Sequence, residues 1–146
     1  MSSRVRTLSV TAALLSAIFA SSIFTPAAAQ RTVDVSANAK GRGGNIGRHD
    51  TRFANNAAQG DRIRISGVCR SACTLVFGRV SRDKICVTPS ARIGFHRGTN
   101  PRATDAMWNA YDSGIQGWIN ARTGGGLPLN FIWMTAPDTY RFFKRC

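Results

Sequence analysis

Ser71 and His96 have the residue types that a Ser-His pair uses in nucleophilic acyl transfer. Ser71 stands where a predicted strand turns into a predicted helix, a position that exposes a hydroxyl while the following amides stay free. His96 closes a predicted strand 25 residues later and could serve as the general base beside that serine. Gly43 and Gly44 follow an earlier strand and could add an amide donor to an oxyanion hole. These residues predict a serine-dependent site.

Each of these features also has an ordinary structural interpretation. A serine at a helix start commonly caps the helix, a single histidine is commonly structural, and a Gly-Gly pair is commonly only a turn. A second histidine, His49, precedes Asp50, but adjacent residues of a helix point apart, so we expect His49 on the surface. Three tryptophans favour core or oligomer contacts over a ligand cage: Trp108, Trp118 and Trp133.

The elements that must position these residues follow from the hydrophobic pattern. Alternating or apolar segments predict strands at 32–36, 62–66, 84–87 and 92–95. Periodicity predicts helices at 46–58 and 71–77, one from 104 to the glycines at 124–126, and a short one at 137–143. Strands and helices that alternate in this way predict a single α/β domain.

The first 29 residues have the features of a secretory signal peptide. Arg4 and Arg6 form a basic start, an apolar stretch follows at 8–24, and alanines at 27–29 form a cleavage site. A membrane anchor is the alternative, but serines dilute the stretch and its small-residue end favours cleavage. The mature protein would be residues 30–146, periplasmic or secreted, with no transmembrane anchor after cleavage.

Export determines how the cysteines are interpreted. Cys69, Cys73, Cys86 and Cys146 form an even set, so disulfides are the default in an oxidising compartment. A zinc site is the alternative, although the spacing lacks the usual paired pattern. Three connectivities are open, and we favour Cys69–Cys73 across a turn with Cys86–Cys146 joining the last residue to the body.

Two segments together resemble a known family. They are Gly-Val-Cys-Arg-Ser-Ala-Cys at 67–73 and Ile-Cys-Val-Thr-Pro-Ser-Ala-Arg-Ile-Gly-Phe-His at 85–96. They resemble the core of Clp-type serine peptidases of the ClpP/crotonase-like superfamily, and more closely their exported bacterial relatives with a C-x-S-A-C element. The resemblance implies a reduced, repeated β-β-α spiral. It also implies Ser71 as nucleophile, His96 as base, and the amides of Gly44 and Ala72 as oxyanion donors.

The third member of the predicted triad departs from that family. The acidic residue of the family lies a few residues before Met134, where this chain has Asn130, Phe131 and Ile132. The chain contains seven aspartates and no glutamate. Asp112 and Asp138 are poorer candidates, so we predict that the Asn130 amide orients His96, as in Cys-His-Asn sites.

These observations predict an exported serine hydrolase that acts on a peptide or acyl substrate without a metal or other cofactor. The alternative is a catalytically degenerate Clp-fold envelope protein that binds anionic partners, because the mature chain carries a formal charge of +11. Nucleic acid is disfavoured, since the aromatic residues do not interleave with the arginines. A homo-oligomer is compatible with the sequence, but a large double ring is not expected from so short a chain.

Overall fold

A computed structural model describes residues 29–36 and 43–146. The predicted signal peptide therefore lies, apart from its last residue, outside the described residues, as does the start of the glycine-rich turn at 39–44. The described part is a mixed α/β structure with two sheets, which confirms the α/β part of the predicted fold. No helix within it combines the length and the apolar character needed to cross a membrane.

The first sheet has four parallel strands. They are β1 (Thr32–Asp34), β2 (Arg62–Ile65), β4 (Ile85–Val87) and β7 (Lys144–Arg145), in the order β1-β2-β4-β7. Along β2 the arginines are exposed and the isoleucines are buried, as the alternation at 62–66 predicts. The last strand, β7, was not predicted, because two exposed basic residues carry no periodic signal.

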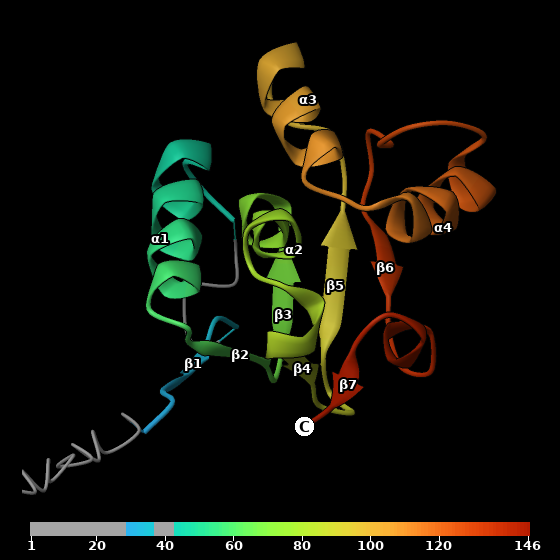
Figure 1. Ribbon diagram of the computed structural model, residues 1–146. Helices are drawn as coiled ribbons and strands as arrows, with labels where there is room; N and C mark the ends of the chain where they lie inside the picture. The colour runs from blue at the N-terminus through green and yellow to red at the C-terminus, as the bar shows by residue number, and fades with distance from the viewer. Residues whose placement is uncertain (1–28, 37–42) are drawn as a thin grey trace, which may run out of the picture.

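The second sheet contains the strands that lead to Ser71 and His96. Its strands are β3 (Val68–Arg70), β5 (Arg92–Phe95) and β6 (Ile132–Met134), with β3 parallel and β6 antiparallel to β5. Figure 1 shows these strands side by side, running across the direction of the first sheet. One face of this sheet is buried in the core through four residues: Cys69, Ile93, Phe95 and Met134.

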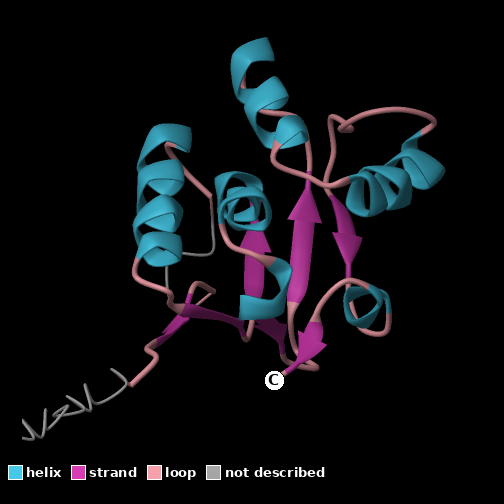
Figure 2. Cartoon of the chain, viewed as in Figure 1, coloured by secondary structure: helices cyan, strands magenta, loops and turns pink. Residues whose placement is uncertain are grey.

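Helices flank the sheets. They are α1 (Ile46–Ala58), α2 (Val76–Arg79), α3 (Pro101–Asn109) and α4 (Ser113–Thr123), with a turn of 3-10 helix (Ser71–Leu75) before α2. Further 3-10 turns lie at Arg82–Lys84 and Asp138–Arg141. Figure 2 shows α1 and α2 lying side by side, and α1 contacts the 3-10 turn as well. The short helices and strands around Ser71 therefore form one packed unit.

The predicted continuous helix after residue 104 is wrong. Asn100 caps α3 by accepting a hydrogen bond from the Ala103 amide, so that helix begins earlier. Asp112 then accepts hydrogen bonds from the amides of Gly114 and Ile115 and starts α4. A side chain that caps a helix favours a new start over continuation, although the apolar period alone runs through both helices.

Both favoured disulfides are present. Cys69 is bonded to Cys73, four residues away, and Cys86 is bonded to Cys146, 60 residues away. All four cysteines are thus engaged, and their thiolates are not available as zinc ligands. In the described part of the chain no group of three or more His, Cys, Asp or Glu side chains could hold a metal ion.

Candidate functional site

Ser71 has an unusual backbone conformation. Its φ is +55°, and no other residue except glycine has a positive φ within the described residues. It follows the end of β3 and begins the 3-10 turn, so the chain reverses sharply at this residue. A side chain in the left-handed region costs on the order of 1–3 kcal/mol and persists only when the surroundings impose it. The predicted strand-to-helix turn is therefore present, and it is strained.

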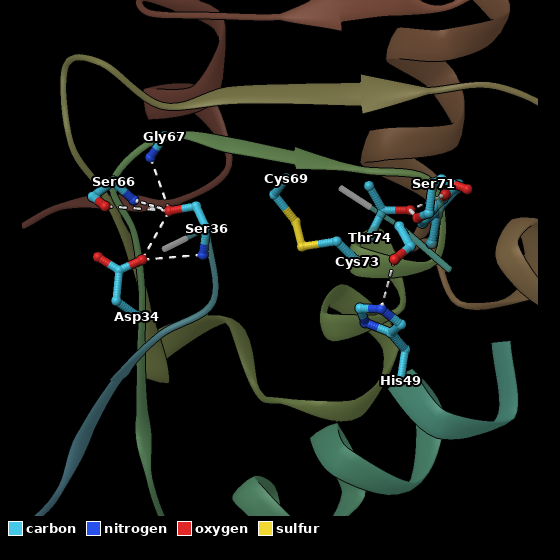
Figure 3. Close-up of a disulfide and its surroundings, with 11 residues drawn as sticks. Asp34, Ser36, His49, Ser66, Gly67, Cys69, Ser71, Cys73 and Thr74 are labelled. Carbon is cyan, nitrogen blue, oxygen red and sulfur yellow. Dashed lines mark hydrogen bonds between the residues drawn. A yellow bond between two sulfur atoms is a disulfide. The ribbon is translucent and has the colours of Figure 1, made fainter. Parts of the chain in front are cut away.

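Neighbouring bonds hold Ser71 in this conformation. The Cys69–Cys73 disulfide spans the turn, with Ser71 midway between its ends (Figure 3). The Thr74 hydroxyl donates to the Ser71 carbonyl oxygen at 2.6 Å and lies 2.6 Å from the buried Tyr111 hydroxyl. The turn is therefore fixed by a covalent bond and by a hydrogen-bonded chain that extends into the core.

The glycine-rich segment lies directly against the side chain of Ser71. A Cβ atom at Gly43 would lie 2.7 Å from Ser71 Cβ and 3.1 Å from Ser71 Oγ, so only glycine fits there. Gly44 follows at the exposed edge of the same turn, and Ala72 is the buried residue after Ser71. The structure brings the segment and the serine together. That the Gly44 and Ala72 amides stabilise an oxyanion stays a prediction.

His49 is buried, so the expectation that it lies on the surface is wrong. Its Nε2 lies 3.2 Å from the Gly43 carbonyl oxygen, which accepts the ring N–H (Figure 3). Burial lowers the pKa of His49, and the charges of Arg52 and Arg48 act in the same direction. The neutral ring therefore holds the Gly43 peptide in place. Its four-residue spacing from Phe53, on the buried side of α1, was the signal in the sequence.

His96 lies at the same sheet edge as Ser71. Arg70 of β3 pairs with Gly94 of the parallel strand β5, and the two functional residues follow the ends of these two strands. No hydrogen bond joins His96 to Ser71 or to Asn130 among the described residues. The Nε2 atom of His96 is buried and has no hydrogen-bond partner within this part of the chain.

An aromatic ring contacts His96. The ring centroids of His96 and Phe131 are 4.1 Å apart, and the Arg70 guanidinium lies over the Phe131 ring. Burial and, to a lesser extent, the charge of Arg70 lower the pKa of His96 below its ordinary value of 6.5. Asn130 itself is exposed. The histidine is therefore neutral near pH 7, and Asn130 as its orienting residue stays a prediction.

The two aspartates considered as poorer candidates have other partners. Asp112 caps α4 and forms an ion pair with Arg82. Asp138 accepts hydrogen bonds from the Trp118 indole and the Arg122 guanidinium. Neither contacts His96 in the part of the chain that the structure describes.

A cleft of about 500 Å³ opens beside Gly44, between the starts of α1 and α3. Its lining is mostly small or polar: Gly44, Asn45, Ile46, Gly47, Thr99, Asn100, Arg102, Ala103 and Ala106. Arg102 is the charged residue of this lining, which contains no carboxylate. The cleft adjoins Gly44, but Ser71, Ala72 and His96 do not line it.

Comparison of the chain with models of protein families, with curated proteins and with solved structures found no match.

Proposed function

We propose that this protein is an exported serine hydrolase of the Clp-peptidase type, with a reduced ClpP/crotonase-like fold. Ser71 is the nucleophile and His96 is the base. The observation that carries the proposal is the backbone of Ser71, with φ at +55° and the glycine segment packed against its hydroxyl. Strain of this kind concentrates at functional sites, and a serine that only capped a helix would not need it.

The proposed reaction is acyl transfer by a Ser-His pair. His96 accepts the proton of Ser71 Oγ, and the oxygen attacks an acyl carbonyl to form a C–O bond. The amides of Gly44 and Ala72 donate to the developing oxyanion. The imidazolium returns its proton to the leaving group as the acyl bond breaks. A water molecule, deprotonated by His96, then cleaves the acyl-enzyme and restores Ser71.

The surroundings of His96 favour slow turnover. The imidazolium that forms in this reaction would lie near the positive charge of Arg70 and against the apolar ring of Phe131, with no carboxylate beside it. A carboxylate normally orients the histidine and stabilises its charged form. We therefore place this protein among serine hydrolases with a Ser-His pair, in which Asn130 would supply at most an amide.

The disulfides support the predicted compartment. Two disulfides that use every cysteine are typical of proteins in the periplasm or outside the cell. We infer that the mature protein begins near residue 30 and is periplasmic or secreted.

Labelling with a fluorophosphonate tests the proposal. The wild-type protein should take one label at Ser71, found by mass spectrometry, and Ser71→Ala should take none. Ser81→Ala is the matched control, because Ser81 is exposed and makes no capping hydrogen bond. His96→Ala should slow labelling by about 10²-fold or more. A folded wild-type protein that takes no label would exclude this function.

A second function is favoured by the same contact between His96 and Phe131. Without a carboxylate at the histidine, the site resembles a degenerate one, and the basic surplus would then serve to bind anionic envelope components. This alternative predicts an unlabelled protein that binds anionic vesicles at physiological salt. Binding only at low salt would indicate nonspecific attraction. Size-exclusion chromatography would show whether the protein is a homo-oligomer.

A further inference from the structure

The second sheet has an outer face whose residues alternate with those buried in the core. Cys69, Ile93 and Met134 point into the core, so their neighbours along the strands point outward. These neighbours include Arg70 on β3, Arg92 and Gly94 on β5, and Trp133 on β6. Register places Arg70 beside Gly94 and Gly94 beside Trp133. The outer face is therefore formed by arginines and aromatic rings around one glycine.

Gly94 allows these side chains to meet. A Cβ atom there would lie 2.8 Å from Trp133 Cζ3 and 2.9 Å from Arg70 Cβ. The indole ring and the stem of Arg70 thus both approach the glycine, from the strands on either side of it. The face is a packed surface, and a larger residue at position 94 would separate its components.

Each arginine of this face rests on a ring. The Arg92 guanidinium lies 4.7 Å from the centroid of Trp133, and that of Arg70 lies 5.4 Å from the centroid of Phe131. The two rings are themselves stacked, with centroids 5.4 Å apart. We call these four residues the arginine–aromatic surface. Stacking restrains each guanidinium and leaves the N–H donors at its edge free for a planar acceptor.

The described part of the protein supplies no carboxylate partner for these two arginines. Neither Arg70 nor Arg92 belongs to an ion pair among the described residues, whereas five of the seven aspartates pair with other arginines. Because the rings already restrain the two guanidinium groups, these side chains lose less conformational entropy when a ligand binds them. The surface therefore fits an external anion.

The surface adjoins the proposed catalytic residues. Arg70 immediately precedes Ser71, and Phe131 contacts the ring of His96. A ligand that binds across the two arginines would extend toward the nucleophile.

We propose that the arginine–aromatic surface binds carboxylate side chains of an acidic peptide, which is the substrate class of the hydrolase. As a statement about substrate, this rests on the function proposed above. Planar carboxylates match the fork of a guanidinium. The rings contact one another and the guanidinium groups, so they do not form a free platform on which nucleic-acid bases would stack.

Peptide binding to the Ser71→Ala variant tests the surface without turnover. A six-residue peptide of alternating Glu and Ala, carrying an uncharged fluorophore, is titrated at 150 mM ionic strength and followed by anisotropy. A second peptide has Gln in place of Glu. Arg70→Gln and Arg92→Gln should each weaken binding of the acidic peptide about fivefold. Arg62→Gln, an exposed position on the other sheet, removes the same charge and should leave binding unchanged.

Several outcomes would overturn the inference. Equal affinity for the two peptides would exclude carboxylate recognition, and equal weakening by Arg62→Gln would show nonspecific attraction. A single-stranded oligonucleotide that binds more tightly, with the same dependence on Arg70 and Arg92, would assign the surface to nucleic acid.

The experiments distinguish failure of the binding proposal from failure of the hydrolase proposal. If the protein binds the acidic peptide but takes no fluorophosphonate label, the arginine–aromatic surface is supported and the hydrolase function is rejected. A labelled protein that does not bind the peptide gives the opposite result. Thermal unfolding of each variant confirms that it is folded.

Discussion

Ser71 has a strained backbone conformation that the residues around it impose. An L-residue at φ +55° is held there by the disulfide that brackets it and by the hydrogen bond from Thr74. The glycine segment contacts it from the other side.

Gly43→Ala should lower the reactivity of Ser71, because the added methyl group would collide with the serine side chain. The added Cβ would lie 2.7 Å from Ser71 Cβ, so the segment must move away from the serine. We expect fluorophosphonate labelling to slow at least tenfold. Gly60→Ala is the matched control, since Gly60 also has a positive φ but has no atom near an added Cβ. Both variants should lose about 1–2 kcal/mol of stability from the backbone term. Equal slowing of labelling in both would contradict the proposed contact.

The pH dependence of labelling should report the pKa of His96. Because the base must be neutral, the rate should rise with pH through that pKa, with a midpoint below 6.5. Burial and the charge of Arg70 both lower this pKa, so Arg70→Gln removes one of the two causes. The midpoint should move to higher pH, and the variant should label more slowly than wild type at pH 6. Stopped-time labelling between pH 5 and 8 measures both curves. An unchanged midpoint would show that Arg70 does not act on the base.

At the scale of elements, a serine joins the end of β1 to the turn between β2 and β3. The amides of Ser66 and Gly67 donate to Ser36 Oγ at 2.7 and 2.8 Å (Figure 3). The Ser36 hydroxyl donates in turn to Asp34 Oδ1 at 2.8 Å. This network fixes where β3 begins, and therefore the position at which Ser71 emerges from the sheet.

Ser36→Ala should destabilise the protein. Two backbone donors would lose their acceptor, which costs about 1–3 kcal/mol of the free energy of unfolding. Denaturation in urea measures the loss, with Ser81→Ala as the exposed control that should change little. A Ser36→Ala protein as stable as wild type would mean that water replaces the hydroxyl without loss.

The hydrophobic pattern of the sequence predicted some helices and strands and missed others. The helix at 46–58 and the strand at 92–95 appear as expected, and the strand predicted at 62–66 ends one residue earlier, at Ile65, because each shows its burial pattern within its own residues. The strands β3 and β6 were not predicted, because β3 directly follows Gly67, which ends the predicted strand at 62–66, and β6 is an apolar segment without alternation. The break between α3 and α4 depends on the Asp112 cap, a local signal that the continuous apolar stripe obscured.

At the scale of the whole molecule, the two disulfides should have different effects. Cys86–Cys146 closes a separation of 60 residues, and Cys69–Cys73 one of four. Loop-closure entropy then gives about 4 kcal/mol for the long bridge and about 2 kcal/mol for the short one. Cys86→Ser with Cys146→Ser should lower stability more but retain Ser71 labelling. Cys69→Ala with Cys73→Ala should lower stability less and lose labelling. Denaturation measures the stability of both double variants, and fluorophosphonate labelling measures the reactivity of Ser71. A larger loss of stability without Cys69–Cys73, or a loss of labelling without Cys86–Cys146 only, would contradict these roles.

The sequence by itself determined the turn at Ser71 and the buried sides of the longer strands, and it favoured one of three open disulfide connectivities, the one that is present. These depend on residue types and periods that lie within a few positions, or on four cysteines with few alternatives. Tertiary structure alone decided that Phe131, not Asn130, lies against His96, and that His49 is buried beneath the Gly43 carbonyl. It also decided that Trp133 lies on the outer face of the sheet. These contacts join residues from separate elements, and strand register and packing, rather than local spacing, set which of them meet.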